Sequence, residues 1–453
     1  MHTPLEWPYL TKLFRPPKFI ISPEGICDTE LVASTLLEHG FPRCEHLLSS
    51  LRSDPAFTGI PERLEEASIQ EAKKISSPLA AAGAGGAGAK STIIPLISDV
   101  WNGSEPINYH AQITLGTPSH PIYVDLDTGS SLLWVQSLLS PADTPPQNQP
   151  IYTPHLSRTS KDLAQTTVVT YGDGSSLLAH LYQDTVTLGE VSATSALLGA
   201  APTHLLRRGL LGSKSGGLFG LSLSPRNLVK TLRSQGAIAS ATISLVGPRN
   251  DPKLAREIDR NRTLAPRGQL VLGDLDRSFY TGEIAWCDLA AVAAGDRWIV
   301  PLDAVRVNGA TILTSQYALI DTGTAYIVTS PAVYSHVKAC IPGAEDINHP
   351  SSTSTQMFSF PASSLQSIEF VFASRALAMK KQDFSLGGIR DEKTGRMASS
   401  IVSIPGDRGL EMFSDMQNLW VIGGIFLDNF VTVFDFEKRK VGFATIAEEE
   451  AAT

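Results

Sequence analysis

Cysteine is scarce in this chain, with four residues among 453. Cys287 could pair with Cys340, or Cys27 with Cys44, and the sequence leaves that connectivity open. No Cys-x-x-Cys pair offers a zinc site. A chain of this length can bury a core large enough to fold without disulfides, and so few cysteines give little support for an oxidising compartment.

Three further kinds of signal are missing. The ten histidines show no metal-ligand spacing, so we predict no metal and no other cofactor. No apolar run reaches the roughly 18 residues of a membrane-spanning helix, and no apolar segment of signal-peptide length follows Met1. Lysine and arginine number 37 against 45 acidic residues, and this net charge of −8 argues against a nucleic-acid partner.

Residues 1–91 read differently from the rest of the chain. One or two short amphipathic helices are predicted within 28–74, and the Ala/Gly tract at 79–90 is typical of a flexible linker. This tract comes near to a phosphate-binding loop, but its lysine, Lys90, stands one position late and no strand precedes it. We therefore predict a leader with a linker and not a nucleotide site.

From Thr92 onward, short apolar or alternating runs are separated by clusters of Gly, Pro, Asn and Ser. This pattern is typical of an all-β protein with many short strands. Residues 227–236 and 330–340, each just after an apolar segment, are the best helix candidates.

Two segments point to chemistry. In 123–135 an apolar strand ends at Asp127, a Thr-Gly turn follows, and a second apolar run begins; 318–328 repeats this order around Asp321. An ionised carboxylate at the buried end of a strand is costly unless it has partners. One copy alone would indicate an ordinary Asx-type turn, but two copies 194 positions apart (321 minus 127) suit a duplicated fold with one carboxylate per half.

These segments resemble the Asp-Thr-Gly loops of the pepsin-like aspartic proteases, the fungal type among them, and the resemblance covers roughly residues 109–444. Other family features match in order: a flap hairpin at 171–176, two hydrophobic-hydrophobic-Gly segments at 217–222 and 420–426, lobe-joining strands at 268–273 and 280–286, and closing strands at 433–436 and 441–444.

The resemblance implies an all-β, bilobal pepsin-like acid protease fold, in which two pseudo-twofold-related β lobes border a cleft and an N-terminal leader precedes them. We predict a leader at 1–91, an N-terminal lobe with the first Asp-Thr-Gly and the flap at 92–287, and a C-terminal lobe with the second at 288–453. We expect a monomer that acts on a peptide or protein substrate.

Location stays open at this point. The family is mostly secreted or vacuolar, yet this sequence shows no recognisable signal peptide. Either the true start lies upstream or is mis-assigned, or the chain is not secreted.

The predicted catalytic pair is Asp127 and Asp321. Two carboxyl groups in contact share one proton at mildly acid pH, and the aspartic-protease dyad is itself the standard worked case of this titration. The ionised member takes a proton from water, while the protonated member donates to the scissile carbonyl oxygen. The predicted function is an aspartic endopeptidase that cleaves between bulky apolar residues at acid pH.

The residues beside the two carboxylates are predicted to support them. By resemblance, the threonines hydrogen-bond across the pseudo-twofold axis. The glycines let backbone approach the carboxylates closely, and the next hydroxyls favour the ionised form. This supporting set is Thr128, Gly129, Ser130, Thr322, Gly323 and Thr324.

The predicted flap comprises Tyr171, Gly172 and Asp173, at a Gly-Asp-Gly hairpin tip. By resemblance, Tyr171 packs beside the first substrate pocket. Asp173 either accepts a basic substrate side chain or only forms the turn, and both readings stay open. Trp134 is expected in the core.

Some departures from the family pattern support an alternative. Gly216 and Gly424 stand where many relatives carry aspartate, and no cysteines occupy the expected C-terminal-lobe disulfide. The alternative is a catalytically weak or inactive pepsin-like protein-binding module. The leader is either an autoinhibitory prosegment of a zymogen, removed by cleavage within 79–90, or a passive extension, since acidic residues slightly outnumber basic ones in it.

Overall fold

The computed structural model describes residues 91–101, 105–139, 151–171, 176–203, 215–248, 264–291, 296–347, 356–390, 396–403 and 416–447. These residues form three β-sheets with few helices, which confirms the predicted all-β class. The predicted leader at 1–91 lies outside the described residues except for its last residue, Ser91.

The largest sheet has 14 strands in the order β12-β25-β24-β10-β11-β1-β3-β4-β9-β5-β8-β7-β6, with β2 paired to β1. Its members are β1 (Thr92–Trp101), β2 (Glu105–Pro106), β3 (His110–Leu115), β4 (His120–Asp127), β5 (Leu133–Ser137), β6 (Lys161–Thr170), β7 (Ser176–Leu188), β8 (Val191–Pro202), β9 (Ser215–Gly220), β10 (Thr242–Val246), β11 (Leu264–Leu272), β12 (Tyr280–Asp288), β24 (Phe430–Asp435) and β25 (Lys440–Ile446).

The other two sheets come from the second half of the chain. One has the order β19-β18-β13-β14-β23-β15-β22 and the other β16-β17-β21-β20. Their strands are β13 (Ile299–Val307), β14 (Ala310–Ile320), β15 (Ile327–Thr329), β16 (Glu345–Asp346), β17 (Phe358–Pro361), β18 (Ile368–Phe372), β19 (Arg375–Ala378), β20 (Ser385–Arg390), β21 (Arg396–Ser399), β22 (Ile401–Ser403) and β23 (Leu419–Ile422).

Both predicted helices are confirmed. They are α5 (Leu228–Ser234) and α7 (Pro331–Ala339), and each begins at a polar cap: the side chain of Asn227 accepts a hydrogen bond from the Val229 N–H, and Ser330 accepts one from Val333. The remaining helical segments among the described residues are α9 (Gly424–Leu427), η2 (Pro154–Leu156), η4 (Arg277–Phe279) and η5 (Lys381–Phe384).

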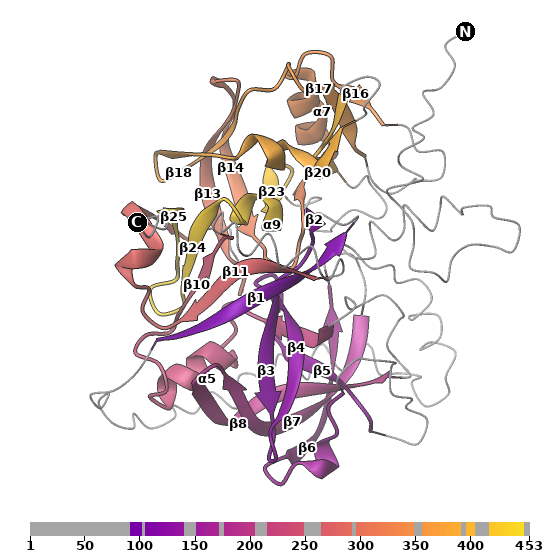
Figure 1. Cartoon of the computed structure of the whole chain (residues 1–453), viewed down its shortest axis with the longest axis vertical. Coiled ribbons are helices and arrows are strands. Elements are labelled where there is room, and N and C mark those ends of the chain that lie inside the picture. The colour runs from indigo at the N-terminus through magenta and orange to yellow at the C-terminus, as the bar shows by residue number, and fades with distance from the viewer. Residues whose placement is uncertain are drawn as a thin grey trace, which may run out of the picture.

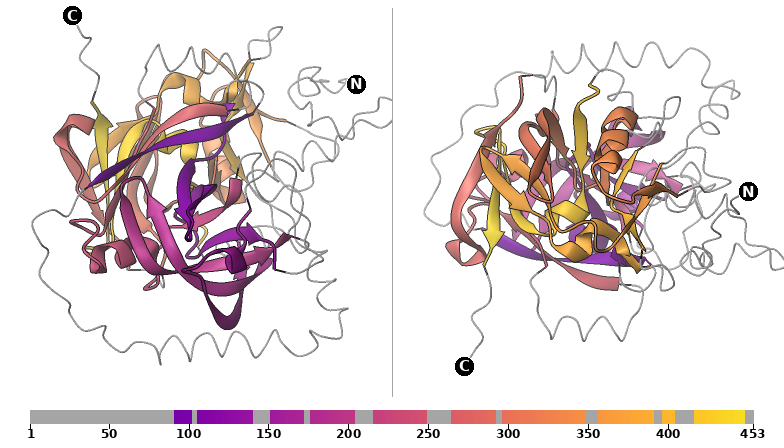
Figure 2. Two further views of the ribbon diagram at one scale, coloured as in Figure 1. Left: turned by 60° about the horizontal axis from the view of Figure 1, so that its bottom comes forward. Right: turned by 90° about the horizontal axis from the view of Figure 1, so that it is seen from above.

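The two halves repeat one strand arrangement. In the first, β4 pairs in parallel with β9, β9 pairs antiparallel with β5, and β5 pairs in parallel with β8. In the second, β14, β23, β15 and β22 pair in the same sequence of directions. In Figure 1 the first set lies below and the second above, and the left view of Figure 2 keeps them apart.

Strands from both ends of the chain join the two halves. The predicted lobe-joining strands appear as β11 and β12, and between them in the sheet lie β10 and the C-terminal strands β24 and β25. Figure 1 shows β1 and β11 crossing the molecule between the upper and lower parts. The predicted boundary near residue 287 falls at the end of β12, before β13.

A buried tryptophan packs at the junction of the halves. Trp298 is fully buried, its indole N–H donates to the carbonyl of Leu221 at 2.9 Å, and its ring meets Phe434 and Phe436 edge-on. Aromatic pairs in this geometry add stability beyond their buried area. Cys287 and Cys340 are free thiols, so this possible pairing is not formed; Cys27 and Cys44 lie outside the described residues.

Candidate active site

The two Asp-Thr-Gly loops occupy equivalent places in the repeated strand arrangement. Asp127 is the last residue of β4, and Asp321 directly follows β14. In each half the neighbouring segment holds the loop by backbone hydrogen bonds: the Ser222 N–H donates to the Ser130 carbonyl at 2.8 Å, and the Gly424 N–H donates to Thr324 at 2.7 Å. Each loop is therefore held by the segment that directly follows β9 or β23.

Thr128 and Thr322 join the loops to each other. The N–H of each donates to the Oγ1 of the other at 3.0 Å. The hydroxyl of Thr128 then donates to the Ile320 carbonyl at 2.8 Å, and that of Thr322 donates to Leu126 at 2.9 Å. Because both threonines are buried, the loops cannot separate without leaving these groups unpaired.

The glycines show how close the two carboxylates lie. A methyl group on Gly323 would stand 2.5 Å from Oδ1 of Asp127 and 3.3 Å from Oδ1 of Asp321. A methyl group on Gly129 would stand 2.8 Å from Oδ1 of Asp321 and 3.1 Å from Oδ1 of Asp127. Both carboxylates thus border one small space that only a residue without a side chain leaves open.

The two carboxylates differ in their surroundings. Asp127 is buried, and this burial, followed by the negative charge of Asp321, raises its pKa well above the ordinary value. The Gly129 N–H donates to Asp127 at 2.8 Å and opposes the rise; the nearby Ser130 hydroxyl also lowers the pKa, although it makes no hydrogen bond of good geometry. Burial and a like charge both disfavour ionisation, so the pair as a whole retains a proton more readily than two separate aspartates.

Asp321 has the richer set of hydrogen-bond donors. The Thr324 hydroxyl donates to its Oδ2 at 2.7 Å, and the Gly323 N–H donates to its Oδ1 at 3.0 Å. The geometry is therefore asymmetric: one carboxylate is buried with few donors, and the other is half-buried with two.

Tyr171 contacts β5, the strand that follows the first loop. It follows β6, and its hydroxyl accepts a hydrogen bond at 2.5 Å from the indole N–H of Trp134, which is fully buried on β5 as expected. Gly172 and Asp173, the rest of the predicted flap, lie outside the described residues, between β6 and β7. The structure therefore brings together the two predicted catalytic aspartates with their neighbouring threonines and glycines, and places Tyr171 of the predicted flap against Trp134.

The family model described as eukaryotic aspartyl protease matches residues 108–446. The chain belongs to this family. Similar proteins include pepsin A of Bos taurus, 25% identical over 352 residues that cover 75% of this chain and 84% of that protein. An aspartic protease of Phaffia rhodozyma is 29% identical over 351 residues (76% and 77%), and cathepsin D of Chionodraco hamatus is 28% identical over 355 residues (74% and 80%). The chain is thus an aspartic endopeptidase, a hydrolase of peptide bonds, of bilobal pepsin-like fold.

In this aspartyl protease the glycine at position 424 has a structural reason. A methyl group there would lie 2.3 Å from Nη2 of Arg267 and 3.3 Å from the Tyr109 ring. The guanidinium of Arg267, with 1% of its residue surface exposed, fills the space that a side chain at Gly424 would take. The sequence shows that an aspartate is missing at this position, but it does not show that the Arg267 side chain occupies the space.

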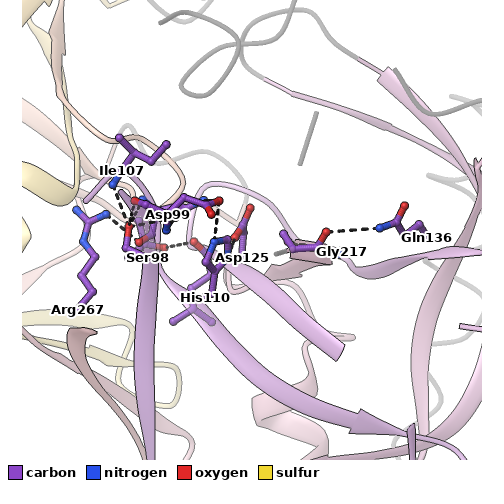
Figure 3. A network of polar contacts seen from close by, with 12 residues as sticks. Ser98, Asp99, Ile107, His110, Asp125, Gln136, Gly217 and Arg267 are labelled. Carbon is purple, nitrogen blue, oxygen red and sulfur yellow. Dashed lines mark hydrogen bonds and ion pairs between the residues drawn. The ribbon is translucent and has the colours of Figure 1, made fainter. Parts of the chain in front are cut away.

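A second polar group missed from the sequence lies behind the first loop. His110 on β3 is fully buried between two carboxylates, with Nε2 3.1 Å from Asp99 and Nδ1 in contact with Asp125 (Figure 3). Burial alone would lower the pKa of His110, but Asp125 and Asp99 together raise it to about 10. The imidazolium is therefore held charged on β3, next to the strand that carries Asp127.

One sequence signal for this group was available. Alternate residues of a strand face the same side, so Asp125 and Asp127 share a face of β4. A histidine within the apolar strand β3 would then be a natural partner, and the structure pairs His110 with Asp125 across the two strands. The pairing depends on strand register, which the sequence alone does not provide.

Across the ranges that the structure describes, no cluster of three or more His, Cys, Asp and Glu side chains could hold a metal ion. None of the helices in those ranges is long and apolar enough to cross a membrane.

Proposed function

We propose that this aspartyl protease is an acid endopeptidase in which Asp127 and Asp321 share one proton and activate a water molecule. The observation that carries the proposal is that both carboxylates border the same small space, next to Gly129 and Gly323. Two like charges this close resist simultaneous ionisation, so one proton is retained between them at acid pH.

The proposed reaction needs no covalent intermediate. The ionised carboxylate takes a proton from water as the water oxygen bonds to the scissile carbonyl carbon, and the protonated carboxyl gives its proton to the carbonyl oxygen. The tetrahedral product then collapses: the C–N bond breaks, the amine nitrogen receives a proton, and a carboxylic acid and an amine leave. We assign Asp127, whose pKa is raised by burial, as the acid, and Asp321, which accepts hydrogen bonds from Thr324 and Gly323, as the base.

We also propose that Tyr171, Gly172 and Asp173 cover an extended substrate whose bulky apolar side chains lie near Tyr171. Tyr171 is partly buried against an apolar cluster that contains Trp134 and Leu177. An aromatic wall of this kind suits apolar side chains. An extended peptide would bind along a strand edge through its main-chain groups.

The test uses the purified chain and a denatured protein as substrate. We expect cleavage at roughly pH 3–5, and Asp127→Asn and Asp321→Asn should each lower kcat by at least about 10³-fold. Asp276→Asn is the matched control, because Asp276 is an exposed helix cap and asparagine caps equally well.

The alternative, a pepsin-like binding module without turnover, predicts ligand binding without cleavage. A folded chain that binds a statine-type transition-state mimic but cuts no peptide in a broad library would reject the endopeptidase proposal. Autoinhibition by the leader is tested separately. If the full chain is as active as residues 91–453 at every pH, the leader is not autoinhibitory.

A further inference from the structure

Arg267 contacts residues that connect to both catalytic loops. It is buried on β11, with Nη1 donating to the Asn108 carbonyl at 2.9 Å and Nη2 3.1 Å from Asp428. Its guanidinium also stacks on the Tyr109 ring, 3.9 Å from the ring centroid. Figure 3 shows Arg267 beside the polar network of Ser98 and Asp99.

One path leads from this arginine to the first loop. Tyr109, on which the guanidinium stacks, accepts a backbone hydrogen bond from the Leu126 N–H at 2.9 Å. Leu126 directly precedes Asp127, and its own carbonyl accepts the hydrogen bond from Thr322. The backbone of Tyr109 therefore holds the residue that directly precedes Asp127.

A second path leads to the other loop. Asp428 caps α9, its N–H donates to Gly424 at 2.9 Å, and the Gly424 N–H donates to Thr324. The Thr324 hydroxyl in turn donates to the carboxylate of Asp321. The Tyr109 hydroxyl, 2.5 Å from Asp428 and 3.2 Å from the Gly424 carbonyl, closes the connection between the two paths.

We propose that Arg267 is a positioning residue that fixes the spacing of Asp127 and Asp321, acting through Tyr109 and Asp428 and touching neither catalytic carboxylate. This inference rests on the proposed function, because it assigns the dyad as the group being positioned. Arginine suits the task, since its planar fork holds several acceptors in fixed directions where lysine offers a point charge.

The surrounding charges are consistent with a balanced arrangement. Asp428 and Asp383 are two carboxylates near Arg267, Asp99 lies in the polar network beside it, Lys380 is a second cation near Asp383, and Tyr109 is a neutral phenol. Burial first, and then Asp428, raises the pKa of Asp383 to about 6, so Asp383 is uncharged in acid while Asp428 stays paired with Arg267.

A purely structural role predicts something different. Removing one member of a buried ion pair destabilises a protein, but removing both is often neutral. The variant Arg267→Met and the double variant Arg267→Met/Asp428→Asn therefore separate stability from positioning. If Arg267 only stabilises, the double variant recovers activity along with stability; if it positions the loops, activity stays low.

The experiment measures kcat, KM and the pH profile of kcat/KM. For the double variant we expect kcat to fall about 10²-fold, as for a small displacement of reacting groups, with KM changed less than about threefold. The two apparent pKa values of the profile should move closer together, because carboxylates that lie farther apart couple more weakly. Arg277→Met, at an exposed arginine paired with Glu283, is the control and should change none of these.

A substrate-free measurement makes the two proposals separable. The unfolding free energy is measured against pH with and without Asp321→Asn. The change that this substitution makes in the pH dependence reports the coupling between the two carboxylates. We expect that change to be smaller in the double variant than in the wild type. A wild type that cuts nothing but shows this change rejects the proposed function and retains the positioning role. If the wild type is active and the double variant has the same kcat, the same two apparent pKa values and the same coupling between the carboxylates, Arg267 does not position the loops.

Arg267→Lys covers the case in which the methionine variants do not fold. It keeps the charge and loses the fork, so we expect an intermediate loss of kcat with the same inward movement of the two pKa values. Wild-type kcat and pKa spacing in a folded Arg267→Lys would overturn the proposal equally.

Discussion

Several side chains that hold the site are buried, polar and paired with residues far away in the chain. Thr128 and Thr322 exchange hydrogen bonds over 194 positions, and Arg267 reaches Asp428 over 161. Each pairing satisfies groups that would be costly to bury alone. At this scale the same residue type has different roles: Asp127 is buried against a like charge, whereas Asp276 is an exposed cap.

The threonine pair gives a residue-scale prediction. Thr128→Val keeps the shape but leaves the Thr322 N–H and the Ile320 carbonyl unpaired, so we expect a loss of about 2–4 kcal/mol in unfolding free energy. Thr128→Ser keeps the hydroxyl and should lose only about 1 kcal/mol for one methyl group. Urea denaturation of both variants is the measurement, and a valine variant no less stable than the serine variant would contradict the account.

His110 gives a pH-dependent prediction. Its pKa is about 10 when folded and near 6.5 when unfolded, so its stabilisation is complete below about pH 6.5 and is lost as pH rises toward 10. We expect His110→Gln to cost about 2–4 kcal/mol at pH 6 and clearly less at pH 10. Denaturation at both pH values measures this, and a deficit that stays constant or grows with pH would show that the ion contacts do not stabilise the fold.

At the scale of elements, the strand–loop–strand frame depends on backbone passing very close to backbone. Gly423, at the start of α9, is the clearest position: a methyl group there would stand 2.2 Å from the carbonyl oxygens of both Thr324 and Tyr326. Neither oxygen can move without shifting the segment that follows Asp321. The glycine is required by the approach of two backbones, not by its own dihedral angles.

A glycine comparison tests this. Gly423→Ala should lose about 3 kcal/mol or more of unfolding free energy through overpacking, together with most activity. Gly236→Ala is the control: its φ of +72° adds strain of about 1–2 kcal/mol, but no heavy atom lies within 4 Å of the new methyl. Equal losses in the two variants, measured by denaturant unfolding, would mean that strain and not close packing sets the cost.

Elements also show what the sequence could and could not predict. Both helices, α5 and α7, were predicted from local sequence, as segments that follow an apolar run, and their polar caps are local as well. The two Asp-Thr-Gly loops stood out because they repeat. The pairing of β12 with β25, and the partners of Arg267, depend on strand register and long-range packing, which no local pattern encodes. A buried arginine between Pro266 and Gly268 gives no local sign that its partners are Tyr109 and Asp428.

At the scale of the whole molecule, the halves of the chain are not separate in the sheet that joins them. The strands β24 and β25, from residues 430–446, lie between β10 and β12, which belong to the predicted N-terminal lobe. They bring Val431, Val433 and Phe434 into buried positions. The predicted division at 287 thus describes the two catalytic frames better than it describes independent folding units.

This arrangement yields a fragment prediction. A fragment of residues 92–287 contains all of β12 except its last residue, Asp288, but lacks β25, its partner, and contains β10 but lacks β24. Unpaired edges and an uncovered apolar cluster should prevent that fragment from unfolding cooperatively on its own. Co-expression with residues 288–453 should restore both strands, and with them a cooperative denaturant transition followed by circular dichroism. The matched control is residues 91–453, uncut, which keeps every described strand and should unfold in a cooperative transition. If the 92–287 fragment alone unfolds as steeply as this control, then β24 and β25 are dispensable for the first lobe and the two lobes are autonomous.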